Sequence, residues 1–272
     1  MKKRMQAGPW IAVAFLAACG FLAWKYYPRP APAPEATAAA PVSPAEPVAG
    51  PPPVEYPIED VPVLPEEEPA EPLPALGGSD AAAWAALAGL LEGQDLAAFL
   101  VPEFLVQRLV TTIDNLPRRE ITRQAYAARP VAGELGRGES NGVAYLDAGN
   151  YARYDTAVAA FEGVDSRRLV STYVRFYPLL QQAYREVAPP GRQFNDRVVE
   201  VIDHLLAAPE PGEPLALVQA EGRPRWEFAD PALEQASIGH KALWRMGPDH
   251  AARVKAKLGQ LRELLAAQRP RE

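Results

Sequence analysis

Cysteine and histidine are scarce in this sequence of 272 residues, which contains one cysteine and three histidines. The cysteine, Cys19, lies near the start, so the rest of the chain cannot form a disulfide, a thiol nucleophile or a cysteine-ligated zinc site. None of the six serines stands in a Gly-x-Ser-x-Gly elbow, and neither His-Glu-x-x-His nor a phosphate-binding glycine loop occurs. The sequence therefore assigns no catalytic residue, no cofactor and no metal site.

An excess of basic residues is also absent. Lysine and arginine total 28 against 34 aspartates and glutamates, which gives a formal net charge of −6. Because affinity for nucleic acid depends on many phosphate-neutralising cations, we predict no nucleic-acid partner.

Charge is missing altogether from Ala7 to Trp24, a run of 18 residues preceded by three basic ones. A helix of this length spans roughly 27 Å, close to the thickness of a bilayer core. The basic residues in front of it predict a cytoplasmic N-terminus under the positive-inside rule. We therefore expect residues 1–27 to form a single-pass inner-membrane anchor, embedded through residues 7–24, with the rest of the chain in the periplasm.

Two alternatives to this anchor remain open. Leu16-Ala17-Ala18-Cys19 resembles a bacterial lipobox, in which the cysteine is lipidated and becomes the new N-terminus. A basic start followed by a short apolar core also fits a cleaved secretory signal. The apolar run continues beyond Cys19 to Trp24, and this favours the uncleaved anchor over both alternatives.

Residues 28–78 hold 16 prolines in 51 positions. Such a segment buries too little apolar surface to offset its ordering entropy, and proline favours extended backbone without amide donors. Nine acidic residues against a single base, Arg29, add self-repulsion. The sequence predicts a disordered Pro/Ala/Glu-rich linker that acts as a spacer. The string from Pro62 to Pro65 fits a PxxP ligand, a weak signal where prolines are so dense.

Residues 79–272 are predicted to form one mainly α-helical domain with a minor β-hairpin, a fold class without the βαβ alternation of dinucleotide-binding folds. Strand patterns occur near Val143 to Leu146, at 215–219 and at 225–228. The helix from Asp165 contains Pro178, where we expect a kink or a restart. Helical periodicity and start and stop signals mark the segments 80–93, 102–115, 150–161, 165–187, 194–207, 231–235, 239–246 and 248–267.

The segment from Phe194 to Leu206 carries a narrow polar stripe on an otherwise apolar helix. Its members fall within about 100° of one another on a helical wheel, and they are Asp196, Glu200, Asp203 and His204. Such a stripe is typical of an acid/base or hard-metal site. We favour a solvated face, or carboxylates paired with arginines of a neighbouring helix, because one helix with several carboxylates is common. No second metal-ligand motif accompanies it.

Tyrosine, asparagine and arginine recur in two other segments, where they predict either structural hydrogen bonds or a groove for a glycan or peptide. His240 and His250 stand alone in polar surroundings, and we expect them at the surface. The residues predicted to bind a partner, taken together with those of the stripe, are Asn150, Tyr151, Arg153, Tyr154, Tyr173, Tyr177, Tyr184, Asn195, Arg197, Asp203 and His204.

Six short strings give the chain a resemblance to the domain-of-unknown-function 3014 family of proteobacterial proteins. The resemblance covers nearly all of residues 79–272 and the layout of anchor and linker. It implies a single domain and a bacterial envelope setting, and it implies no activity. The strings, in order, are Asp114 to Arg118, Asn150 to Tyr154, Tyr177 to Leu179, Gln182 to Tyr184, Phe194 to Arg197 with Ile202 to Leu206, and Arg245 to Gly247.

We therefore expect a non-enzymatic binding or scaffold module, anchored in the membrane, whose helical domain docks on an envelope protein or the cell wall. Tethering raises the local concentration of the domain, so weak docking is sufficient. The alternative is a hydrolase of envelope glycan that uses Asp196, Glu200 or Asp203. A glycosidase needs two carboxylates across a cleft, and the sequence identifies no opposing acid.

Overall fold

The computed structural model describes residues 53–65, 71–91, 93–120, 125–212, 214–220 and 225–267. The predicted anchor at residues 7–24, the alternative lipidation site Cys19 and the predicted linker up to residue 52 lie outside these described residues. Within them, no helix combines the length and the apolar character that a membrane span requires.

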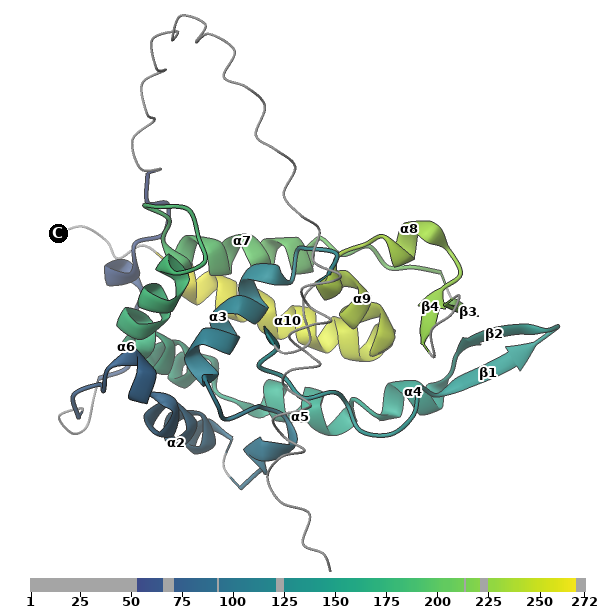
Figure 1. Ribbon diagram of the computed structural model, residues 1–272, viewed down its shortest axis with the longest axis horizontal. Helices are drawn as coiled ribbons and strands as arrows, with labels where there is room; N and C mark the ends of the chain where they lie inside the picture. Colours follow the sequence, from purple (N-terminus) through teal and green to yellow (C-terminus); the bar gives the residue numbers. More distant parts are fainter. Residues whose placement is uncertain are drawn as a thin grey trace, which may run out of the picture. The chain divides into compact units, whose positions relative to one another are not determined.

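Helices dominate the described residues, as the sequence predicts (Figure 1). Three are short 3-10 turns, η1 (Ile58–Asp60), η2 (Leu76–Gly78) and η3 (Leu96–Ala98). The α-helices are α2 (Asp80–Leu90), α3 (Leu105–Asn115), α4 (Ala148–Ala152), α5 (Asp155–Gly163), α6 (Ser166–Arg185), α7 (Phe194–Leu206), α8 (Pro231–Glu234), α9 (Ile238–Arg245) and α10 (Pro248–Leu265).

Local signals account for several helix ends. Asp165 caps α6, because its carboxylate accepts a hydrogen bond from the Arg168 N–H at 2.8 Å. The helix then runs through Pro178 without a restart. The predicted single helix from Asn150 is instead two helices, α4 and α5, and Asp147 rather than Asn150 caps the first of them.

Four short strands form one antiparallel sheet in the order β1-β2-β3-β4. They are β1 (Arg137–Ser140), β2 (Val143–Leu146), β3 (Ala216–Gln219) and β4 (Trp226–Phe228). Asn141 and Gly142, with φ of 50° and 77°, form the tight turn between β1 and β2. The predicted hairpin of β3 and β4 is present, and the sheet is larger than predicted because Ala144 of β2 pairs with Leu217 of β3.

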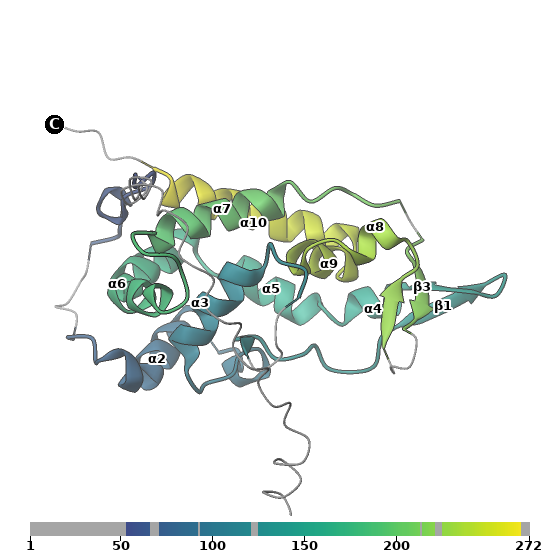
Figure 2. The ribbon, with the colours of Figure 1, turned by 45° about the horizontal axis from the view of Figure 1, so that its top comes forward.

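The main core lies among α3, α6, α7 and α10. Figures 1 and 2 show α7 running beside α10. Phe194 of α7 is fully buried, and its ring lies 5.2 Å from that of Tyr184 and 6.4 Å from that of Tyr173. A smaller core joins the sheet to α9 and consists of Leu146, Leu215, Leu217, Phe228 and Trp244.

The segment of residues 53–65, called the strap below, belongs to the folded part of the molecule. Val61 is only 1% exposed and joins the main core, as does Leu76 further along the chain. The expectation of a disordered linker up to residue 78 therefore does not hold for residues 53–65 and 71–78. The proline content predicted disorder here, because the few apolar residues that the domain buries give only a weak signal in the sequence.

Candidate functional site

The polar stripe of α7 begins at the strap. The Asp196 carboxylate accepts hydrogen bonds from the N–H groups of Tyr56 at 2.7 Å and Glu55 at 3.3 Å. The neighbouring Asn195 is fully buried, and its amide nitrogen donates to the Tyr56 carbonyl at 2.9 Å. These two predicted site residues therefore hold backbone groups of the same chain.

The remaining carboxylates of the stripe pair with arginines. Glu200 accepts hydrogen bonds from Arg192 at 2.8 Å and from Arg197 at 3.1 Å. Asp203 forms a bidentate ion pair with Arg262 of α10. Arg262 Nη2 donates to Asp203 Oδ2 at 3.0 Å, and Arg262 Nε donates to Asp203 Oδ1. The charges of Glu200 and Asp203 are therefore neutralised by nearby arginines.

Arg197 itself connects α7 to α3. Its guanidinium donates to the Asp114 carboxylate at 2.8 Å and to the Asp114 carbonyl at 2.6 Å. Asp114 is 8% exposed and also accepts a hydrogen bond from Arg118 at 3.1 Å. A buried charge held this way is costly to leave without its partner, so this pair fixes how α3 lies against α7.

The predicted tyrosines lie between α6 and α7, inside the domain. The Tyr177 hydroxyl donates to the Gln181 side chain at 2.8 Å, and the Tyr173 hydroxyl donates to Asn195 at 3.2 Å. Burial raises the pKa of the Tyr173 hydroxyl well above its usual value, and nearby Tyr177 and Asp196 raise it further. Tyr184 is 2% exposed. These rings pack in the core and their hydroxyls have internal partners.

A second polar cluster surrounds α4. Asn150 is fully buried; its amide nitrogen donates to the Arg245 carbonyl at 2.6 Å, and its amide oxygen accepts from Arg153 at 2.8 Å. Arg153 also donates to the carbonyls of Val131 and Gly133, each at 3.0 Å. Asn150 and Arg153 thereby join α4 to the end of α9 and to the loop before β1.

Aromatic residues complete this cluster. The Tyr151 ring lies against Gly247, where an added Cβ would come within 2.6 Å of the ring. Burial raises the pKa of Tyr154, an effect that Arg153 and Arg245 oppose. The predicted site residues thus gather in two separate places, around α4 and around α6–α7, and most of them serve internal contacts.

The histidines differ from their predicted placement. The rings of His204 and His240 stack with centroids 4.2 Å apart, and the His204 ring lies 2.8 Å from the Ser237 hydroxyl. Burial lowers the pKa of His204, and His240 and Arg197 lower it further. His250 is buried and its ring contacts Asp155 at 2.9 Å. The prediction that His240 and His250 lie at the surface is therefore wrong for His250, and His240 is only partly exposed.

Clusters of three metal-binding side chains do not occur among the residues that the structure describes. The stacked histidines therefore carry no third ligand within that part of the chain.

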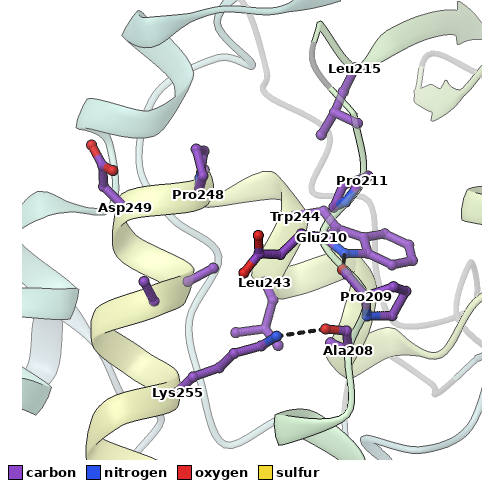
Figure 3. Close-up of a pocket in the computed structure, with 13 residues that line it drawn as sticks. Ala208, Pro209, Glu210, Pro211, Leu215, Leu243, Trp244, Pro248, Asp249 and Lys255 are labelled. Carbon is purple, nitrogen blue, oxygen red and sulfur yellow. Dashed lines mark hydrogen bonds between the residues drawn. The ribbon is translucent and has the colours of Figure 1, made fainter.

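A pocket lies between α10 and the loop that joins α7 to β3 (Figure 3). Its volume is about 300 Å³. Two hydrogen bonds hold the loop in place: the Trp244 indole donates to the Pro209 carbonyl at 2.8 Å, and Lys255 donates to the Ala208 carbonyl at 2.6 Å. The apolar residues that line the pocket include Leu215, Leu243, Trp244 and Pro248.

Glu210 distinguishes this pocket from the clusters described above. Its carboxylate is exposed, and within the described ranges no hydrogen-bond or ion-pair partner contacts it. Figure 3 shows it projecting between the loop and α10, whereas Asp249 points away. An apolar pocket with a free carboxylate suits a small ligand, or a side chain of a partner, that combines apolar and cationic parts. The sequence does not predict the pocket, because Pro209, Pro211 and Pro214 indicate only a loop between a helix and a strand.

Comparison with known proteins shows the family. Residues 105–262 match the family described as "Protein of unknown function (DUF3014)", so the chain belongs to it. The match contains both polar clusters and the pocket, and it begins after the strap. No curated protein and no solved structure matches the chain.

Proposed function

We propose that this member of the DUF3014 family is a membrane-anchored binding or scaffold module of the bacterial envelope. Residues 7–24 cross the inner membrane with the N-terminus in the cytoplasm, and the folded domain lies in the periplasm. The uncharged run between three basic residues and the globular sequence supports this arrangement. The family match adds no activity, since the family is described only as a protein of unknown function.

Docking is assigned to the pocket beside Trp244. The single observation that carries this assignment is the contrast between Glu210, which the sequence does not predict as a site residue, and the residues that it does. Asn150, Asn195 and their neighbours hold internal contacts, whereas Glu210 faces the pocket and has no partner among the residues that the structure describes. The partner is a protein or a cell-wall component that presents a cationic group next to an apolar one.

The glycan-hydrolase alternative finds no support in the geometry of the stripe. An acid catalyst must face a second carboxylate across the substrate. Asp196 instead accepts hydrogen bonds from the strap, and Asp203 pairs with Arg262. We therefore assign the stripe to structure and not to catalysis.

Location is tested with a reporter enzyme that is active only outside the cytosol, fused after the last residue of the full chain. We expect an active reporter, and we expect the intact chain to stay with the membrane after a carbonate wash. An inactive reporter, or release by carbonate, contradicts the proposed anchor. The mass of the mature chain separates a membrane helix from a lipid at Cys19.

Docking is tested by placing a large side chain at an exposed position that lines the pocket. Ala252 is exposed on α10 and lines the pocket, whereas Ala256, also exposed, lies one turn further along the helix and outside the lining. We expect Ala252→Trp, but not Ala256→Trp, to lower at least tenfold the amount of envelope protein or wall fragment that the full chain retains. Equal retention by the two variants contradicts docking at this pocket, and Glu210→Gln separates the contribution of charge from that of shape.

A further inference from the structure

We propose that the surface formed by α6, α7 and the end of α10 is a peptide-binding groove, filled in this structure by the strap of the same chain. This inference does not depend on the membrane anchor or on the pocket. It assigns a shared task to Asn195, Asp196 and Ser171, which the sequence alone leaves without a common role.

The groove recognises the backbone of the strap through side chains. Asp196 accepts hydrogen bonds from two successive N–H groups, those of Glu55 and Tyr56, and Asn195 donates to the Tyr56 carbonyl. Further along, the Leu64 N–H donates to the Ser171 hydroxyl at 2.8 Å. Extended and polyproline-like peptides are common ligands of protein grooves, and here side chains hold the backbone near both ends of the strap.

The strap has the conformation of a bound peptide. Pro57, with φ of −60° and ψ of 133°, and Val61, with φ of −68° and ψ of 124°, have polyproline-like backbone on either side of the η1 turn. Prolines keep such a segment extended before it binds, which lowers the entropic cost of binding.

One apolar side chain anchors the strap. Val61 is 1% exposed within the main core, and the partly buried Tyr56 and Ile58 pack against the same core. The ligand that this groove takes is therefore a proline-containing peptide with a tyrosine, one tight turn and a small aliphatic residue five positions after the tyrosine. The groove lies mostly within the residues matched by the family, whereas the strap lies before them.

The full chain can test this with a labelled peptide of the sequence of residues 53–65. Val61→Asp expels the strap from its own groove, because an unpaired carboxylate is not tolerated in the core. We expect the labelled peptide to bind this variant at least tenfold more tightly than it binds the wild-type chain, whose groove is filled. Adding Asp196→Ala should abolish the gain, and adding Glu200→Ala, one turn along α7, should leave it unchanged.

Circular dichroism shows whether each variant keeps its helices. Tyr56→Pro provides a second way to release the strap, because it removes the N–H that donates to Asp196 and the aromatic ring. If both releasing variants lose their helical signal, the helices do not fold without the strap and the proposal is overturned. It is also overturned if the helices persist and the peptide binds both variants no better than it binds the wild-type chain.

Discussion

The helical part of the molecule, built on α3, α6, α7 and α10, and the sheet part, built on β1 to β4 with α9, use polar residues differently. In the helical part, Asn195, Gln181 and the Asp114–Arg197 pair are enclosed and tie helices to each other and to the strap. The sheet part has a core of five buried residues, and the pocket opens at its border with α10. The residues that the sequence predicts as a site therefore make mostly internal contacts, while the pocket proposed for docking lies between α10 and a proline-rich loop.

The largest expected effect concerns the main core. Phe194→Ala removes a fully buried ring that packs on two tyrosines, and it should lower the free energy of unfolding by about 4 kcal/mol. Urea unfolding followed by helical circular dichroism measures the change. Val187→Ala, at a residue that is 52% exposed, is the control and should change the free energy of unfolding by less than about 0.5 kcal/mol. Similar changes in the free energy of unfolding for the two variants would contradict the assignment of Phe194 to the main core.

The next effect concerns the turn between α9 and α10, which faces α4. Gly247 has φ of 89°, and a Cβ there would lie 2.6 Å from the Tyr151 ring. Gly247→Ala should therefore cost about 3 kcal/mol, the sum of a strained backbone and a steric clash. Gly142→Ala is the matched control in the β1–β2 turn. Its φ is 77° and no atom of the described residues lies within 4 Å of the added Cβ, so the expected cost is about 1 kcal/mol.

A smaller effect is expected at the centre of the α4 cluster. Asn150→Ala leaves the Arg245 carbonyl and one Arg153 donor without their partner, which should cost about 2 kcal/mol. The measurement is the thermal midpoint of the full chain. If Asn150 bound an external ligand instead, the variant would keep its midpoint and lose binding, and that result would contradict the internal role.

The smallest effect is a dependence of stability on pH at the histidine pair. Because burial, His240 and Arg197 lower the pKa of His204, the unfolded chain binds this proton more readily than the folded chain. The contribution of His204 to stability is therefore complete above its usual pKa of about 6.5 and decreases as the pH falls below that value. Unfolding of the wild-type chain and of His204→Gln from pH 7.5 to 5 measures it. An identical pH dependence in the two would contradict the stated shift.

Local sequence signals predict most of the helices and fewer of the strand pairings. The periodicity from Phe194 to Leu206 and the capping residue Asp165 place α7 and α6 within a residue or two of their observed bounds. The Asn141-Gly142 turn is also a local signal, and it could have identified the first hairpin. The pairing of β2 with β3 depends on tertiary contacts between distant segments, and no local pattern encodes it.

The candidate site could be predicted only in part. Residue type marks Asn150, Asn195 and Arg197 as unusual, but a helical wheel does not show whether a polar side chain faces solvent or a buried partner. The sequence did not predict that the strap packs against the domain, because its anchoring depends on Val61 in a stretch otherwise rich in proline. The pocket depends on how α10 meets a loop far away in the sequence, which composition does not reveal.

The most direct test of the proposed docking role places a photo-crosslinking residue at position 252 of the full chain in cells that produce it, with position 256 as the control. The account predicts a covalent adduct with an envelope protein or a wall fragment from position 252, absent from position 256 and lost when Glu210→Gln is added. Adducts from both positions alike, or from neither, would contradict docking at the pocket beside Trp244.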